Sequence, residues 1–521
     1  MKRLIIADPN VNPRRYPREI FRLLEILPGA AVWLTLLAPF LLSYRFPLFI
    51  TTSIIIFDVF WLMKSLQTAV SLLRGWFILR ANLRRDWHQQ LELSLAARSG
   101  PEDTDIIDWR EVYQAVIFPT YKEEEAILEA SIGSVADADY PTDRKILVLA
   151  TEARDSENAR KVAAHLKEKF AHRFSLFLVT EHPDGIVGEV KGKGANATWA
   201  AKELVTEMGK RHIDLAKVVV TTADADTRFY KGYLQCLTYM YSTTPDRTRC
   251  SYQPVATFTN NIWEASMIAR VLALQTTFWQ MVESTRDWRL ITFSTHAMSL
   301  QTLDDMDYWC TTVVNEDSRQ FYRAYFRYAG QFRAIPLFLP VYMDAVHLGS
   351  FRATMKNLYL QQQRWAYGAE HTPYVILESL RHREIPLLSR ISLVWRQVSG
   401  HFSWATQAFF ITVVGWLPVL LNHTFAQQVV AYNFPTVTKL LLTITWVGIL
   451  CSNFVSFQML PPRPSLQNRG TTLTKLFSML LQWVMVPITS IFFGAFVSID
   501  SQTRLMLGRY LGFRVTEKKA L

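Results

Sequence analysis

Cysteine is scarce in this sequence, and that scarcity argues against two classes of protein. The 521 residues contain 4 cysteines, and none of them stands at a CxxC or other metal-binding spacing. Disulfide-stabilised secreted scaffolds and cysteine-rich metal proteins are dense in regularly spaced cysteine. The sequence therefore predicts reduced thiols in a cytosolic environment and no disulfide framework. The cysteines are Cys236, Cys250, Cys310 and Cys451.

A cleavage site for a signal peptide is also missing. The apolar run from about Leu27 to Tyr44 has no small-residue cleavage site, and a second run, from about Pro47 to Met63, follows it at once. A removable signal peptide ends in such a site. Each run is close to the ~20 residues that a bilayer-spanning helix needs. We therefore expect a transmembrane hairpin. Asp58, within the second run, would face a protein or water-filled interior, as in a channel, or pack near the helix end.

No motif for nucleic-acid binding accompanies the formal net charge of +11. The excess Lys and Arg gather on both sides of the hairpin, although an ordinary basic surface would also account for them. Such flanks favour an anionic membrane face. We expect a multi-pass protein of the plasma (inner) membrane, in contact with its lipids, with the N-terminus and the chain after Arg74 in the cytoplasm and no nucleic-acid partner. The clusters are Lys2, Arg3, Arg14, Arg15, Arg18 and Arg22 before the hairpin, and Arg74, Arg80, Arg84 and Arg85 after it.

Apolar segments return in the last third of the chain. Two of them carry enough polar residues to suit the membrane interface, two are long enough to span, and a last one is interrupted by Pro487. Because both flanks of this last stretch are basic, it would not be a simple single span if both were cytoplasmic. It would lie at the interface, re-enter the membrane, or belong to a set of six spans. The interface helices are Phe351 to Ala369 and Pro386 to Ser399, the spans Phe402 to Leu421 and Pro435 to Phe457, and the last stretch Leu473 to Ile499.

Between these membrane segments, short apolar strands alternate with amphipathic helices. This βαβ pattern predicts a largely parallel sheet with helices on both faces. The strand Val218 to Thr222 ends in Asp224-Ala225-Asp226, and ligands bind beyond the carboxyl ends of such strands. Two carboxylates there suit Mg²⁺ or Mn²⁺ completed by the phosphates of a nucleotide diphosphate. The other strands are Ala115 to Phe118, Ile146 to Ala150 and Ser175 to Val179, and a helix from Ile262 to Ser284 follows as core.

Other polar motifs accompany this acid pair, although each also occurs on ordinary protein surfaces. The loop Lys191 to Asn196 supplies cations and mobile amides before a helix, which suits phosphate. Glu316-Asp317 would present a carboxylate as general base. Arg364-Trp365 offers a forked cation for a diphosphate and an indole face for a sugar.

In this order, these motifs resemble those of the membrane-embedded family-two glycosyltransferases, the cellulose synthase and hyaluronan synthase superfamily. The resemblance covers roughly Val112 to the C-terminus and includes Pro119-Thr120-Tyr121, Gln361-x-x-Arg364-Trp365 and a tail that matches a gating motif. It implies an α/β GT-A-like (Rossmann-like) cytoplasmic domain inserted between N-terminal and C-terminal transmembrane helices. It also implies a metal-dependent, inverting transfer of a sugar from a nucleotide sugar, expected to be UDP-linked, to a glycan.

The resemblance implies a role for each matched residue. Asp317 would be the general base, beside Glu316, and Trp365 would pack at the acceptor sugar. The remaining assignments are nucleotide binding by Thr120, Glu123, Glu152, Lys193, Asp224, Gln361 and Arg364, metal binding by Asp224 and Asp226, and gating by Phe513, Val515, Thr516 and Lys518.

The sequence departs from the family pattern at a few positions. Glu152 stands where relatives carry an Asp-rich motif, Asn315 replaces Thr before Glu-Asp, and Lys122 stands where Asn is common. The gating-like motif is nearly terminal here, which puts a complete polymer channel in doubt. Two alternatives stay open: transfer of one sugar to a lipid-linked acceptor, and a membrane scaffold without catalysis.

These inferences divide the chain into successive regions. The divisions are a basic N-terminus (1–26), a transmembrane hairpin (27–70), a juxtamembrane linker (71–111), the GT-A-like domain (112–350), interface helices (351–400), a C-terminal transmembrane region (401–499) and a cytoplasmic tail (500–521).

Overall fold

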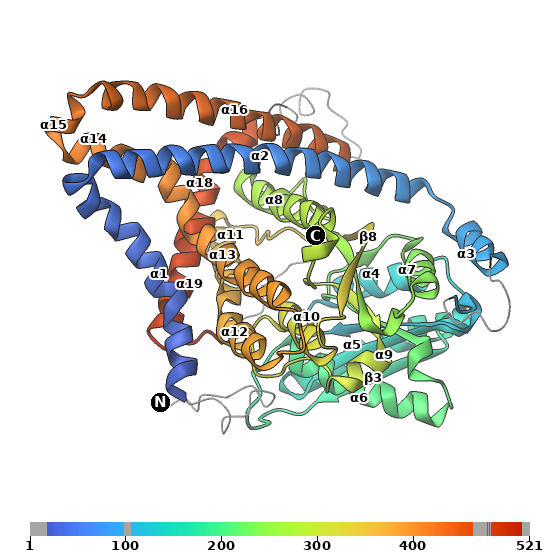
Figure 1. Ribbon diagram of the computed structural model, residues 1–521. Helices are drawn as coiled ribbons and strands as arrows, with labels where there is room; N and C mark the ends of the chain where they lie inside the picture. The colour runs from blue at the N-terminus through green and yellow to red at the C-terminus, as the bar shows by residue number, and fades with distance from the viewer. Residues whose placement is uncertain (1–17, 98–105, 462–476, 478, 480, 513–521) are drawn as a thin grey trace.

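The computed structural model describes residues 18–97, 106–461, 477, 479 and 481–512 (Figure 1). The gating-like residues Phe513, Val515, Thr516 and Lys518 lie outside the described residues, so their roles stay predictions. The four cysteines are free, and three of them are buried.

A single sheet of 8 strands, in the order β3-β2-β1-β4-β7-β6-β8-β5, organises the middle of the chain. All four predicted strands are present, as β1 to β4, with ends within three residues of the expected ones. The strands are β1 (Tyr113–Pro119), β2 (Lys145–Glu152), β3 (Leu176–His182), β4 (Val218–Thr222), β5 (Arg228–Phe229), β6 (Cys250–Thr257), β7 (His296–Ser299) and β8 (Arg333–Tyr342).

Both faces of the sheet are buried. Successive side chains of a strand point to opposite faces, so one strand contributes to both cores. Val116 and Phe118 of β1 belong to the core formed with α4 (Glu125–Ala136) and α5 (Ser156–Phe170). Ala115 and Ile117 belong to the opposite core, formed with α6 (Lys193–Lys210). The prediction of helices on both faces is confirmed.

The sheet is mixed rather than largely parallel, which corrects the sequence-based expectation. β1 to β4 pair with one another in parallel, but β7 runs antiparallel to both β4 and β6. β7 has only four residues and no apolar run of its own, so the sequence pattern gave no signal for it. Because it is antiparallel, β7 begins at the edge where β4 ends, with His296 opposite Thr222.

Most of the remaining helices of the α/β part contribute buried residues to the two cores on the faces of the sheet. The helix expected from Ile262 to Ser284 belongs largely to the core, as predicted. It starts at Met267, because the Ser266 hydroxyl accepts a hydrogen bond from the amide of Ala269 and caps the helix there. The helices are α3 (Trp87–Ala96), α7 (Tyr233–Thr243), α8 (Met267–Ser284), α9 (Leu300–Asp305), α10 (Glu316–Arg327), α11 (Phe351–Ala366), the short helix η8 (Tyr367–His371) and α12 (Thr372–Arg381).

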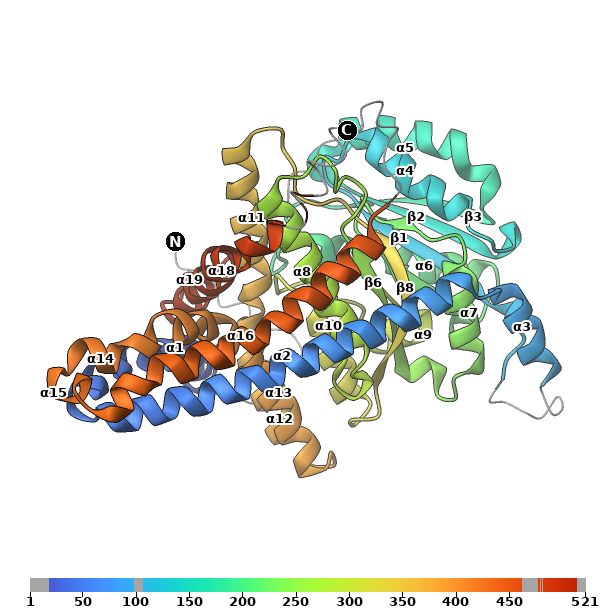
Figure 2. The ribbon, with the colours of Figure 1, turned by 90° about the horizontal axis from the view of Figure 1, so that it is seen from above.

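The N-terminal hairpin forms two helices, α1 (Arg18–Arg45) and α2 (Pro47–Arg84), separated by Phe46. They diverge after the turn: α2 lies alongside α16 (Val429–Met459), whereas α1 packs against α19 (Phe496–Met506) (Figures 1 and 2). Asp58 of α2 is buried, as expected for an acid that faces protein.

The expected interface helix Pro386 to Ser399 and the expected span from Phe402 are one helix, α13 (Leu387–Thr412). The chain bends by 44° after Thr412 and continues to α14 (Leu417–Leu421). Arg390 and Arg396 are among the polar residues of the expected interface helix, yet both bond protein. Arg390 donates to the carbonyls of Ile385 and Ser379, and Arg396 donates to that of Arg289.

The last apolar stretch is helical from Gln482 to Met506 and includes a π-helical turn, Ser490–Ala495. The helix therefore continues past residue 500, where the tail was expected to begin. By length and composition, three helices among the described residues can cross a membrane, or four if the bent pair is one span. These candidates lie at both the N-terminal and the C-terminal end of the α/β part.

Candidate active site

The polar motifs predicted from the sequence converge at the carboxyl-terminal edge of the parallel strands. The amide of Ala223 donates to the carbonyl of Ile117 at 3.0 Å, and that of Thr120 to the carbonyl of Ala150 at 2.9 Å. These two bonds align the ends of β1, β2 and β4. The acid pair that follows β4 therefore lies at the edge where the sheet predicts a ligand crevice.

The basic loop delivers Lys193 to this edge, at the first residue of α6. Its Nζ lies 2.7 Å from Asp224 Oδ1. Burial acts to lower the pKa of Lys193, but the carboxylates of Asp224, Glu316 and Asp317 outweigh that effect and raise it above its usual value. The loop thus places a fixed cation at the amino end of a helix, the arrangement that binds phosphate.

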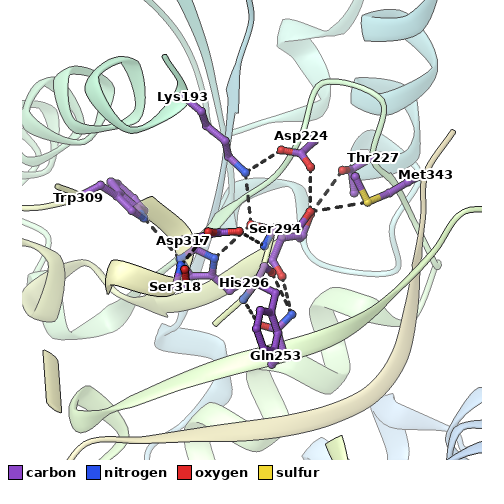
Figure 3. Close-up of polar contacts among 12 residues, drawn as sticks. Lys193, Asp224, Thr227, Gln253, Ser294, His296, Trp309, Asp317, Ser318 and Met343 are labelled. Carbon is purple, nitrogen blue, oxygen red and sulfur yellow. Dashed lines mark hydrogen bonds and ion pairs between the residues drawn. The ribbon is translucent and has the colours of Figure 1, made fainter. Parts of the chain in front are cut away.

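Ser294, just before β7, connects the two acidic motifs (Figure 3). Its hydroxyl donates to Asp224 Oδ2 at 2.8 Å, and its amide donates to Asp317 Oδ2 at 2.7 Å. Its carbonyl accepts from Lys193 Nζ at 3.2 Å. Ser294 adopts a φ of 46°, in a region that non-glycine residues enter at a cost and that is frequent at functional sites. One strained residue therefore fixes the spacing of both acids and the lysine.

Glu316 and Asp317 begin α10, and their environments differ. Asp317 is partly exposed, and its Oδ1 accepts from the Ser318 amide at 2.7 Å. Glu316 is buried, and this burial, together with the neighbouring Asp317, raises the pKa of Glu316 to about 7. Two adjacent acids in different environments suit separate roles, with the partly exposed one able to accept a proton.

Gly194 allows α6 and α10 to approach each other at this point. A Cβ on Gly194 would lie 2.9 Å from both Cβ and Cγ of Glu316 and 2.9 Å from the carbonyl oxygen of Cys310. Any larger residue would push the two helix starts apart. The glycine in the basic loop is therefore required by packing against the acidic motif.

The motif of Gln361, Arg364 and Trp365 lies on one face of α11, as the i, i+3, i+4 spacing dictates. The carbonyl of Arg364 accepts from Asn315 Nδ2 at 3.0 Å, and the positive charge of Arg364 acts to lower the pKa of Glu316. Trp365 packs at 6.3 Å, centroid to centroid, from Phe258, which follows β6. Arg364 and Trp365 therefore border the same edge, and Gln361 is one helical turn away.

The residues expected to bind the nucleoside already have hydrogen-bond or ion-pair partners within the protein. Glu123 Oε2 accepts from the Thr120 hydroxyl at 2.8 Å and from the Tyr121 amide, and Glu152 pairs with Arg154. The cavity lined by Thr120 and Glu123 measures about 10 Å³, the space of a single water. A nucleobase would therefore need these side chains to rearrange.

The metal prediction rests on two carboxylates. Asp226 is 1% exposed, and its Oδ2 accepts from the Asp344 amide at 2.9 Å, whereas the side chain of Asp224 is 29% exposed. Within the described ranges, no three His, Cys, Asp or Glu side chains converge on a point that could hold a metal ion. This donor set fits a hard cation only if phosphate oxygens and water complete its shell.

A larger cavity, of about 750 Å³, lies beside α11, between α1 and the Gln482–Met506 helix. Half of its lining residues are aromatic, and Lys356, Asp500 and Thr503 are polar. Asp500 accepts from the hydroxyl of Tyr359 at 3.2 Å. The lining residues include Trp33, Met355, Tyr359, Phe492, Phe493 and Phe496.

Sequence reasoning missed Ser294, His296 and Glu370. His296 is buried, and burial followed by the charge of Lys193 lowers its pKa to about 4, so the ring is neutral near pH 7. Ser294 and His296 escaped notice because the antiparallel β7 has no strand pattern. The one available signal was a run of hydroxyl residues and a histidine, Ser294-Thr295-His296, inside an otherwise apolar stretch.

Comparisons with known proteins give only distant likenesses. No protein-family model matches the chain, and no curated protein matches it. Among solved structures, the chain is similar to the mannosyltransferase PcManGT from Pyrobaculum calidifontis in complex with GDP-Man and Mn2+, at 13% identity, a TM-score of 0.36, and coverage of 81% of this chain and 99% of that chain.

Two further likenesses are of the same kind. S. aureus TarS 1-349 in complex with UDP-GlcNAc matches at 15% identity and a TM-score of 0.34, over 68% of this chain and 93% of that chain. GalNAc-T7 with UDP, GalNAc and Mn2+ matches at 10% identity and a TM-score of 0.31, over 62% and 58%. At such low scores these likenesses carry no argument, so the function must be inferred from the site itself.

Proposed function

We propose that this protein is a membrane-integral, inverting glycosyltransferase that moves a sugar from a nucleotide sugar, expected to be UDP-linked, to a growing polysaccharide. One observation carries the proposal: Ser294 holds Asp224, Asp317 and Lys193 together at the carboxyl edge of the parallel strands. A cation suited to a diphosphate and a base-like carboxylate thus lie together at one edge of the sheet.

Sugar transfer requires a base for the acceptor hydroxyl and stabilisation of the departing diphosphate. Asp317 takes the first role: amides fix both of its oxygens, and each oxygen keeps a lone pair for the incoming proton. Lys193 and Arg364 take the second role, because both are cations close enough to the acidic motif that their charges act to lower the pKa of Glu316. Direct displacement by the acceptor oxygen then inverts the sugar carbon without a covalent enzyme intermediate.

Asp224 and Asp226 would hold Mg²⁺ or Mn²⁺ together with the donor diphosphate, and the cation would neutralise charge on the leaving group. Asp224 contacts Lys193 in the structure, so the ammonium offsets its charge. Thr120, Glu123, Glu152 and Gln361 would complete the nucleotide site, with Trp365 at the acceptor. The gating role of the tail after Gly512 is proposed on its sequence alone.

The membrane setting is part of the proposal. The described helices provide three or four candidate spans on both sides of the α/β part. A multi-pass arrangement with the crevice in the cytoplasm agrees with the basic flanks of α1 and α2.

A second candidate function, transfer of one sugar to a lipid-linked acceptor, is favoured by the aromatic cavity beside α11. Its location between two candidate spans and its aromatic side chains suit an acyl or isoprenoid chain better than a hydrated glycan, and Lys356 and Asp500 would lie near a polar head group. Incubation of the purified protein with labelled nucleotide sugars, Mn²⁺ and membrane lipid, followed by sizing of the product, separates the two. A ladder of long products supports polymer synthesis, a single glycolipid supports the second candidate, and no labelled product contradicts both.

A further inference from the structure

Glu370 lies on the short helix η8, six residues after Arg364, and its carboxylate faces the start of α10. Its Oε1 accepts from the amide of Val314 at 3.1 Å and from that of Asn315 at 3.3 Å. These two amides immediately precede Glu316 and Asp317. The side chain of Asn315, the N-cap residue of α10, makes no capping hydrogen bond. Glu370 therefore supplies, from another element, an acceptor for two amides at the entry to this helix.

Further contacts fasten the same two segments together. Asn315 Nδ2 donates to the carbonyl of Arg364 at 3.0 Å, and the Ser318 hydroxyl lies 3.0 Å from His371 Nε2. Val314 also shares a small apolar cluster with Tyr367 and Ala369. The segment 314–318 thus meets η8 through polar bonds at both ends and apolar packing at Val314.

The short helix η8, which carries Glu370, is itself held by neighbouring residues. Gln397 of α13 donates to the carbonyl of Gly368 at 2.9 Å and accepts from the hydroxyl of Tyr322 of α10 at 2.9 Å. A Cβ on Gly368 would lie 3.1 Å from Cε1 of His401, so η8 and α13 are in close contact. Because these neighbours hold η8 in place, the position of Glu370 determines the position of the segment that it bonds.

The charge of Glu370 also suits this location. A carboxylate near the amino end of a helix interacts favourably with the helix dipole. Arg319 of α10 acts to lower the pKa of Glu370, although burial has the larger effect and raises it to about 7. Either protonation state keeps an oxygen available to accept the two amide hydrogens.

We propose that Glu370 is a positioning residue for the reaction: it holds Val314 and Asn315 so that Asp317 is aligned with the acceptor hydroxyl. This inference rests on the proposed function, since it assigns the alignment of the proposed base. A general base works when its oxygen lies within about 2.6–3.2 Å of the heavy atom that carries the proton, or reaches it through one water. A displacement of about 1 Å can cost roughly 100-fold in rate.

The test compares variants of the full-length protein. Glu370→Ala removes the acceptor, Glu370→Gln keeps an oxygen of the same reach, and Glu157→Ala removes a carboxylate whose side chain is 88% exposed on α5. We expect Glu370→Ala to lower kcat by about 10- to 100-fold with little change in donor KM. Glu370→Gln should restore most of kcat, and Glu157→Ala should leave it unchanged. A purely structural role would instead reduce the amount of folded protein and leave kcat per folded molecule unaltered.

Hydrogen exchange provides a readout that does not depend on activity. Peptides covering residues 310–320 should exchange faster in Glu370→Ala, and not in Glu370→Gln or Glu157→Ala. Normal kcat in Glu370→Ala, with an active wild type, overturns the positioning role and leaves the proposed function standing. A wild type that releases no nucleoside diphosphate from any donor overturns both proposals, and the exchange rates then decide whether Glu370 holds the segment at all.

Discussion

The sheet edge and the long helices differ in which side chains they bury and which they expose. At the sheet edge, the strands β1, β2 and β4 are completely buried in their central residues, and the acids that follow β4 accept hydrogen bonds from neighbouring donors. On α1, in contrast, Leu34 and Leu41 are 71% and 78% exposed. Water penalises such exposure by about 25 cal/mol per Å² of apolar surface, whereas lipid does not. One chain thus combines a preorganised polar site with helices suited to an apolar solvent.

The largest expected effect concerns the base. Asp317→Asn keeps the size of the side chain and an acceptor oxygen but removes the basic carboxylate. Turnover should fall by roughly 10²-fold or more, while donor affinity stays near that of the wild type. Single-turnover kinetics and a donor-binding titration measure the two quantities separately. An unchanged rate would remove Asp317 from the mechanism.

The next effect concerns the acid pair. Asp226→Ala should abolish donor binding that depends on Mn²⁺, because the remaining Asp224 supplies too few ligands to hold the cation. Isothermal titration of the donor with Mn²⁺ and with EDTA measures this dependence. Tight donor binding by the wild type in EDTA would contradict the metal assignment.

A smaller effect is expected at Ser294. Ser294→Ala removes the hydroxyl that orients Asp224 but keeps the amide bond to Asp317. A hydrogen bond to a charged group contributes about 1.5–3 kcal/mol, so kcat/KM should fall by about 10- to 100-fold. The effect should be seen mainly in metal and donor affinity. Thr206→Ala, which removes an exposed hydroxyl of α6, serves as the control. Equal loss in both variants would show that the hydroxyl of Ser294 has no special role.

The pH dependence of stability should reflect Glu316. Its folded-state pKa is about 7 against an ordinary value of 4.5, so the folded protein binds more protons than the unfolded chain between these values. The free energy of unfolding should therefore fall as pH rises from about 4.5 to about 7, by at most about 1.4 kcal/mol per pH unit for one group. Glu316→Gln should show a shallower fall in Tm over this range. An identical slope in both proteins would contradict burial of an ionisable Glu316.

The smallest effect on turnover is expected on the helices. Leu34→Lys on α1 should leave kcat of detergent-solubilised protein nearly unchanged, because Leu34 is far from the α/β core in sequence and is exposed. Recovery in the membrane fraction should drop, since a charge within a span costs about 2.5–3.5 kcal/mol. Leu34→Ala is the matched control. Full membrane recovery of Leu34→Lys would show that this face of α1 does not contact lipid.

The sequence predicted the features that depend on local patterns and missed those that depend on contacts between distant segments. The strands β1 to β4 and the acids after β4 were predictable, because apolar runs and the residues that directly follow them are local patterns. The antiparallel β7 and Ser294 were not, because their location depends on which strand pairs with β4. Arg390 and Arg396 lie in the helix expected at the membrane interface, but they bond the backbone carbonyls of Ser379 and Arg289, which belong to other segments. Glu370 was missed for the same reason, since its bonds to Val314 and Asn315 join segments 55 or more residues apart.

The release of nucleoside diphosphate is the most direct measure of the proposed chemistry. Purified wild-type protein should release it from at least one nucleotide sugar in the presence of Mn²⁺ or Mg²⁺, EDTA should stop the release, and Asp317→Asn should slow it by roughly 10²-fold or more. Release that is equally fast in Asp317→Asn, or its absence with every donor and cation tested, would contradict a sugar-transfer site at the end of β4.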